Sequence, residues 1–211
     1  MSTSIIFDSK TSEGKTVLDQ MSVDKLFVRF VGKNSPLHDE LTLQREIAPG
    51  LRLAPSVMLP EGDSVRGAAA LSPRVMEHLS LDEDTVFARA IENSAKLLPP
   101  VIMPLHEMLG APSLGPNGPI AVTNREGFLG ASVLVYPGVI EELTERCGGA
   151  FYILPSSIHE VLALPMSSEF DVADLTNMVR SINAGMLDSS DILSDSVYRY
   201  DPDTNTFEEV M

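Results

Sequence analysis

The stretch FYILPSSIHEVLALP, residues 151–165, constrains the fold more than any other part of the sequence. Its two apolar runs, FYIL and VLALP, have the length and the bounding residues of short buried strands. Between the runs, Pro155 ends the first strand, and Ser157 and Glu160 have the spacing of a capping box. The sequence therefore predicts two short strands joined by a polar corner at residues 155–160.

Residues 80–98 predict the best-defined helix of the chain. Ser80 and Glu83 have capping-box spacing at its start, and Pro99-Pro100 ends it because proline cannot continue a helix. Five side chains fall on one face of this helix, and they are Phe87, Ala90, Ile91, Ser94 and Leu98. A helical period and strand-like runs therefore occur in the same chain.

The remaining elements alternate between the two types. Further strands are predicted at residues 25–31, 50–59, 67–71, 119–124 and 130–136 and as a hairpin over 197–210. Further helices are predicted within 36–50, from Pro73, within 104–109, from Pro137 to Gly148-Gly149, and after the cap Asp171. Within 50–59, Pro55 indicates a sheet edge or a bulge. Because no strict strand–helix–strand rhythm appears, the predicted class is α+β, with about five helices packed on mixed sheets.

The domain organisation is predicted to be simple. Residues 1–22 are expected to form a flexible N-terminal segment, and residues 23–211 a single α+β domain. Residues 67–79 and 130–143 look alike, since each has a Gly-Ala strand followed by a proline-opened helix. The likeness indicates either a weak internal duplication or two caps that require the same residue types.

The charge of the chain limits its partners. Thirty acidic and 15 basic residues give a formal net charge of −15, which argues against nucleic acid and anionic membranes as partners. No lysine follows Lys96, and from Ser167 onward ten acids accompany only Arg180 and Arg199. This region is interpreted either as a solvated acidic surface or as a docking face for a basic protein partner.

The expected location is the cytoplasm. The single cysteine, Cys147, cannot form an internal disulfide, which favours a reducing compartment. The first residues lack the apolar core of a signal peptide, and no apolar run reaches the ~18 residues that span a bilayer.

The polar corner also contains candidate catalytic groups. Ser156 and Ser157 lie within three residues of His159, and a remote acid such as Asp195 could orient the histidine. This predicts, as the alternative function, a hydrolase or transferase. The glycines that surround a hydrolase nucleophile are missing, however, and a capped turn explains the same residues.

No cofactor or metal is predicted. The histidines His38, His78, His106 and His159 each lie beside an acid, but none forms a metal-binding motif. Glycine-rich phosphate-binding motifs are also missing. Cys147 lies on the apolar face of its predicted helix, near the C-terminus, where a reactive thiolate is not expected.

Several segments resemble a known family. LFVRFVGKNSPLHDEL, IENSAKLLPP, FYILPSSIHEVLALP and ILSDSVYRYD, in this order, are similar to an uncharacterised bacterial family, domain of unknown function 5688, over residues 22–205. A likeness to uncharacterised family 1444 is more distant. The resemblance implies no activity, but its most specific pieces mark candidate binding residues, which are Ser156, Ser157, His159, Glu160, Ser194, Asp195 and Tyr198.

The predicted function is therefore a non-enzymatic cytoplasmic binding or protein-interaction module with an acidic surface. The corner at residues 155–160 and the C-terminal hairpin are expected to form or support the partner site.

Overall fold

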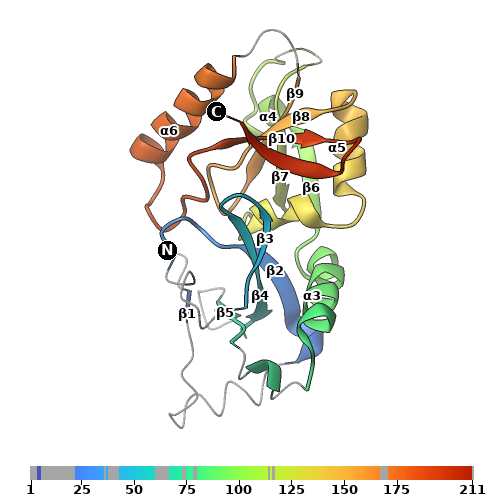
Figure 1. The fold of residues 1–211 in the computed structure, drawn as a ribbon. Coiled ribbons are helices and arrows are strands. Elements are labelled where there is room, and N and C mark those ends of the chain that lie inside the picture. The colour runs from blue at the N-terminus through green and yellow to red at the C-terminus, as the bar shows by residue number, and fades with distance from the viewer. Residues whose placement is uncertain are drawn as a thin grey trace.

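Two sheets and the helices around them form the chain (Figure 1). The computed structural model describes residues 4–5, 22–35, 37, 43–59, 67–72, 75–77, 80–113, 115, 117–166 and 171–210. The combination of sheets and helices confirms the predicted α+β class. The predicted flexible segment, residues 1–22, lies outside the described residues except for residues 4, 5 and 22.

The smaller sheet has five strands. In spatial order they are β1 (Ser4–Ile5), β5 (Ala68–Ala70), β4 (Leu51–Met58) and β2 (Leu26–Phe30), and β3 (Arg45–Ala48) also pairs with β4. The pair β1–β5 is parallel and the other pairs are antiparallel.

The larger sheet has six antiparallel strands. In spatial order they are β11 (Thr206–Val210), β10 (Val197–Asp201), β8 (Phe151–Leu154), β9 (Val161–Pro165), β7 (Ile120–Asn124) and β6 (Pro100–Pro104). The two apolar runs of FYILPSSIHEVLALP are its adjacent strands β8 and β9, as predicted.

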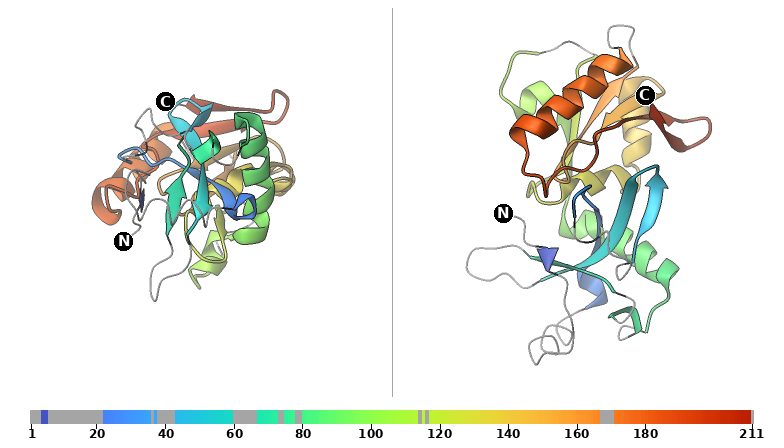
Figure 2. Two further views of the ribbon diagram at one scale, coloured as in Figure 1. Left: turned by 90° about the horizontal axis from the view of Figure 1, so that it is seen from below. Right: turned by 60° about the vertical axis from the view of Figure 1, so that its left-hand side comes forward.

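Helices cover both faces of the larger sheet. Among the described residues, the helices with complete bounds are the α-helices α3 (Glu83–Leu97), α4 (Leu105–Met108), α5 (Val139–Cys147) and α6 (Val172–Met186) and the 3₁₀ helices η1 (Val23–Lys25) and η3 (Gly130–Val135). Residues 75–77 are helical as well. Helix α6 lies over one face and α5 over the other, as the two oblique views agree (Figure 2).

The strand period explains this layering. In β8, Phe151 and Ile153 point into the main core, whereas Leu154 packs with Leu175 and Val179 under α6. Successive side chains of a strand face opposite sides of its sheet, so each strand contributes to two apolar layers.

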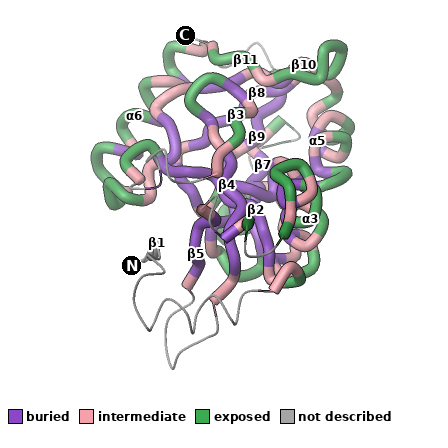
Figure 3. Tube along the Cα trace, turned by 60° about the horizontal axis from the view of Figure 1, so that its bottom comes forward, coloured by how far each residue is buried: buried purple, intermediate pink, exposed green. Residues whose placement is uncertain are grey.

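One continuous core connects the two sheets. Phe27 of β2, Phe87 of α3, Val133 of η3 and Phe151 of β8 belong to the same buried cluster. Buried segments of both sheets gather in the middle of the molecule (Figure 3), and two smaller buried clusters are separate from this main one. The sheets are therefore fixed to each other by apolar packing as well as by the polar contacts described below.

Proline 55 occupies an unexpected position. It lies in β4, between β5 and β2, and not at a sheet edge. The carbonyl of Pro55 accepts the N–H of Leu71. A residue with an N–H at position 55 could have donated it to the carbonyl of Leu71 in return. Because proline has no N–H, the carbonyl of Leu71 accepts the N–H of Leu43 instead. A central proline is tolerated here because a neighbouring segment replaces the missing donor.

The predicted strand over residues 130–136 is wrong, because Gly130–Val135 forms the 3₁₀ helix η3. Leu129, which precedes it, has a φ of 51°, in the left-handed region that an extended strand does not use. A Cβ atom at Gly130 would lie closer than 3.0 Å to Thr123 Oγ1 and to the carbonyl oxygen of His159. The close approach of three chain segments therefore decides this conformation, and the two segments thought to be duplicated have different structures.

Several element boundaries also differ from the predictions. Asp82, not Ser80, caps α3, and its carboxylate accepts the N–H of Thr85 at 2.9 Å. Part of the predicted helix within 36–50 is strand β3, and strand β6 follows directly after α3 although no strand was predicted there. The predicted caps Asp171 and Gly148 are confirmed.

Candidate functional site

The corner at residues 155–160 is held by main-chain hydrogen bonds to a distant segment. Ile158 N–H donates to the carbonyl of Asp191 at 2.9 Å, and Leu193 N–H donates to the carbonyl of Ser156 at 2.9 Å. Ser157 and Ile192 form an isolated β-bridge between these bonds. The corner is thus paired with residues 191–194, which precede β10.

Ser157 stabilises the turn itself. Its side chain is buried, and its hydroxyl oxygen accepts the N–H of His159 at 3.0 Å. This is a local serine turn, in which a hydroxyl replaces a main-chain acceptor. The capping-box spacing of Ser157 and Glu160 does not open a helix here, and Glu160 is exposed.

His159 is held at three points. Its Nδ1 accepts the N–H of Leu129 at 3.2 Å, and its carbonyl accepts the Thr123 hydroxyl at 2.8 Å. Because Nδ1 is an acceptor, the neutral ring carries its proton on Nε2, and Nε2 lies 3.7 Å from Asp191 Oδ1. Asp191, and not Asp195, is therefore the acid beside this histidine.

These contacts leave no nucleophile–base pair at the corner. Ser157 Oγ accepts from a main-chain N–H, and the two ring nitrogens of His159 face Leu129 and Asp191. A serine nucleophile requires an unprotonated ring nitrogen at hydrogen-bond distance. Within residues 156–159 that arrangement is not formed.

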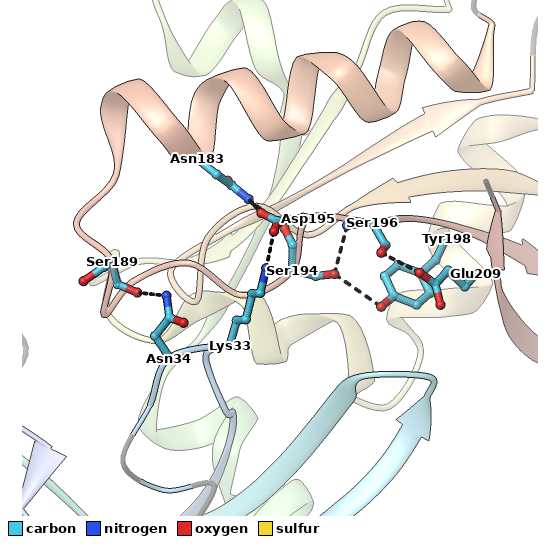
Figure 4. A network of polar contacts seen from close by, with 9 residues as sticks. All are labelled: Lys33, Asn34, Asn183, Ser189, Ser194, Asp195, Ser196, Tyr198 and Glu209. Carbon is cyan, nitrogen blue, oxygen red and sulfur yellow. Dashed lines mark hydrogen bonds and ion pairs between the residues drawn. The ribbon is translucent and has the colours of Figure 1, made fainter.

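A second polar network surrounds the start of β10 (Figure 4). Lys33 forms an ion pair with Asp195, and the side-chain amide of Asn183 donates to Asp195 Oδ1 at 2.8 Å and to the carbonyl of Ser194 at 2.9 Å. The hydrogen bonds from Lys33 and then Asn183 lower the pKa of Asp195. Asp195 is thus ionised, and its carboxylate already binds Lys33 and Asn183.

The turn after β2 docks on the loop before β10. Lys33 N–H donates to the carbonyl of Ile192 at 2.8 Å, and the Asn34 side chain donates to the carbonyl of Ser189 at 3.0 Å. A Cβ atom at Gly32 would lie 3.0 Å from the Ile192 oxygen. These bonds connect the smaller sheet to the loop that leads into the larger one.

Tyr198 connects the sheets at a second point. Its hydroxyl donates to the carbonyl of Pro49, in the β3–β4 turn, at 2.7 Å and lies 3.3 Å from Ser194 Oγ. Ser194 Oγ also accepts the N–H of Ser196 at 3.1 Å. Tyr198 is buried, and burial raises the pKa of its phenol.

Two neighbouring cavities open beside this network. The first, of about 390 Å³, is lined by Lys33, Pro49, Gly50, Arg52, Leu193, Ser194, Asp195, Ser196, Tyr198 and Glu209. The second, of about 310 Å³, is lined by Ala173, Thr176, Asn177, Arg180, Ser196, Glu209 and Val210. Because Ser196 and Glu209 line both, the two cavities adjoin, and we call them together the Ser196 groove.

The charged groups of the Ser196 groove fall into two classes. Both carboxylates have internal partners, since Asp195 pairs with Lys33 and Glu209 accepts the Ser196 hydroxyl at 2.5 Å. Arg52 and Arg180 have neither a hydrogen bond nor an ion pair to any described residue. Among the described residues, the groove therefore has two guanidinium groups that form no hydrogen bond or ion pair, although the charge of Arg180 helps to lower the pKa of Asp195.

The structure separates the candidate residues into two groups. Ser194, Asp195 and Tyr198 line the Ser196 groove. The other four, Ser156, Ser157, His159 and Glu160, line neither cavity and belong to the corner behind it. The binding role of each group stays a prediction.

Sequence reasoning missed the charged residues that complete the groove. Lys33, Arg52, Arg180 and Glu209 come from the turn after β2, from β4, from α6 and from β11. No motif connects positions so far apart. Arg180 alone carried a signal, because it is one of two cations among the ten acids that follow residue 166.

Other candidate chemistry receives no support from the geometry. Among the described residues, no group of three or more His, Cys, Asp or Glu side chains is placed to hold a metal ion, while His38 and His78 lie outside those residues. Burial raises the pKa of the Cys147 thiol to about 11, which suppresses the thiolate at neutral pH. None of the described helices combines the length and apolarity needed to cross a bilayer.

Comparison with known proteins gives one match. The model of the Family of unknown function (DUF5688) matches residues 51–202, which is more than half of the 211-residue chain. No curated protein and no solved structure matches the chain. The matched region includes the corner and the whole of β10 but not Lys33 or Glu209.

Proposed function

Since the chain belongs to the Family of unknown function (DUF5688), its function has to be argued from the site, and we propose that the protein is a non-enzymatic binding module. It takes a segment of a partner protein into the Ser196 groove. The corner at residues 155–160 supports the groove from behind through its bonds to residues 191–194.

One observation carries this proposal. In a chain with a formal net charge of −15, two arginines that form no hydrogen bond or ion pair with any described residue line adjoining cavities in which both carboxylates are already engaged. An arginine side chain at a protein surface gains little stability from an ion pair, because water already solvates its charge. Folding therefore does not require the two arginines to line these cavities. It is suited to recognition of an external group.

The groove is also rigid before any partner arrives. Asp195 is held by Lys33 and Asn183, and Tyr198 is held by Pro49 and Ser194. A site whose side chains are already ordered loses less conformational entropy on binding. The serine hydroxyls of the groove also have partners, since Ser194 bonds to Tyr198 and Ser196 to Glu209, which favours binding over nucleophilic chemistry.

The hydrolase or transferase alternative has weaker support. It requires Ser156 or Ser157 to be activated by His159, but the nearest partners of the His159 ring are Leu129 N–H and Asp191. A location in the cytoplasm, a bacterial origin and the distant relation to family 1444 stay predictions.

A photocrosslinking experiment tests the proposal. A benzophenone amino acid replaces Asn177, which lines the groove, and, as a matched control, Glu145, an exposed helical position on α5. In cells of the source organism, we expect the Asn177 position to give a discrete protein adduct and the Glu145 position to give none. Equal adducts at both positions, or no adduct at Asn177, would refute a binding role for the groove.

A further inference from the structure

The order of charges along the Ser196 groove restricts what it can bind. Arg52 lines only the larger cavity, Arg180 lines only the smaller one, and Glu209 lines both. Glu209 is therefore common to both cavities, and each cavity has one arginine of its own. Because the remaining pair, Lys33 with Asp195, is internally neutralised, the groove presents the charge sequence positive, negative, positive.

We infer that the partner segment carries the complementary sequence, an acidic residue, then a basic residue, then an acidic residue, in an extended stretch of chain. This inference rests on the proposed binding function and specifies the chemistry of the ligand. Electrostatic complementarity of this kind sets register and specificity more than it sets affinity.

Each end of the groove suits a carboxylate. Arg52 is half-buried in β4, and Arg180 lies on the exposed side of α6. A guanidinium group offers paired N–H donors that match the two oxygens of a carboxylate. Ser196 lines both cavities and Asn177 lines the smaller one, so a hydroxyl and an amide group are also available to a ligand.

The middle of the groove suits a cation. Glu209 uses Oε1 to accept the Ser196 hydroxyl, and a carboxylate has further lone pairs available. A lysine or arginine of the ligand would neutralise Glu209. A uniformly acidic ligand would instead meet this carboxylate and the −15 net charge of the chain.

The shape of the groove favours a peptide over a compact metabolite. Sites for small molecules are enclosed and have few polar groups, whereas the Ser196 groove consists of two adjoining hollows whose linings include five charged side chains, Lys33, Arg52, Arg180, Asp195 and Glu209. Polyphosphates and nucleic acids are excluded by the central Glu209 and by the net charge.

Titration of the ¹⁵N-labelled full chain with short peptides tests the inference. One probe set has glutamate, lysine and glutamate separated by one to three glycines, and the control set has lysine, glutamate and lysine with the same spacers. We expect a glutamate–lysine–glutamate peptide to shift the amide resonances of Gly50 and Ser196, which line the groove. The charge-reversed peptides should leave these resonances in place.

Charge exchange makes the test specific. Arg180→Ala is expected to weaken binding by about three-fold to five-fold, the range of exposed ion pairs, and Arg180→Glu to abolish it. A peptide with lysine in place of the glutamate at one end should restore binding to Arg180→Glu. Arg125→Ala, which removes an exposed arginine away from the groove, should leave the affinity unchanged.

The outcomes separate the two proposals. If charge-reversed peptides shift Gly50 and Ser196 as strongly as the matched ones, or if Arg180→Glu is not rescued, the inferred charge sequence is wrong. The crosslink at Asn177 would then still support the groove as a binding site. If no crosslink forms at Asn177 either, both the inferred ligand and the proposed function are refuted.

Discussion

The corner at residues 155–160 and the segment at residues 194–198 use the same residue types for different purposes. In the corner, Ser157 and His159 bond to main-chain N–H groups and line neither of the two cavities. In residues 194–198, the serines and Asp195 have similar internal bonds but also line the Ser196 groove. Whether a polar cluster can bind a ligand therefore depends on the cavity beside it and not on the residue types it contains.

The largest effect should come from filling the space behind the corner. Gly130→Ala is expected to lower the free energy of unfolding by about 3 kcal/mol, because its Cβ would overlap the carbonyl oxygen of His159 and the main-chain nitrogen of Asn124. Chemical denaturation measures this change.

Gly185→Ala is the matched control for this substitution. Gly185 lies in α6 with open space around the added atom, so we expect a gain of about 0.5 kcal/mol. If Gly130→Ala were as stable as the wild type, the tight packing of the corner would be contradicted.

The next largest effect is expected from removal of the Ser157 hydroxyl in the corner. Ser157→Ala leaves the N–H of His159 without its acceptor in a buried turn, and a loss of about 2 kcal/mol is expected. Ser196→Ala removes a hydroxyl at the less buried groove, so its loss should be smaller, below about 1 kcal/mol. If Ser196→Ala lowered the melting temperature more than Ser157→Ala, the structural role of the corner and the binding role of the groove would have been assigned wrongly.

A smaller effect is expected where the groove joins the two sheets. Tyr198→Phe removes the donor to the carbonyl of Pro49 while keeping the ring in the core. We expect a loss of about 1 kcal/mol in urea denaturation, with crosslinking at Asn177 retained. Tyr200→Phe, which removes a phenol bonded to Asn205 near the hairpin turn, is the control and should cost less.

The smallest effect depends on pH. The pKa of Asp195 is lowered in the folded protein, mainly by the hydrogen bond from Lys33. Its contribution to stability is therefore present above the unfolded pKa of about 3.9 and lost as the pH falls through the folded pKa.

Asp195→Asn removes this contribution. The gap in melting temperature between wild type and Asp195→Asn should narrow as the pH falls below about 4, whereas Asp188→Asn, at an exposed position, should show no comparable gap. A gap that widened in acid would contradict the Lys33–Asp195 pairing.

The larger sheet was more predictable than the smaller one. Strands β8 and β9 are short apolar runs whose alternate residues face different layers, so composition and length identify them. Pro55 suggested an edge but lies in a central strand, because Leu43 supplies the N–H that Pro55 lacks. Local patterns do not show such long-range compensation.

The site was predictable only in part for the same reason. Ser194, Asp195 and Tyr198 are close in sequence, and the family resemblance marked them. Arg52 and Arg180 come near this segment only after the β3–β4 turn and α6 have folded against it. A property created by tertiary structure, such as an arginine without an internal partner, has no signal in a single sequence.

The most direct test compares the photocrosslink yield at Asn177 in two further variants, Arg180→Ala and His159→Ala, under conditions where both remain folded. We predict that Arg180→Ala lowers the adduct yield by about three-fold to five-fold, because Arg180 lines the groove, whereas His159→Ala retains the wild-type yield despite lower thermal stability. A retained adduct in Arg180→Ala together with a lost adduct in a folded His159→Ala protein would contradict it.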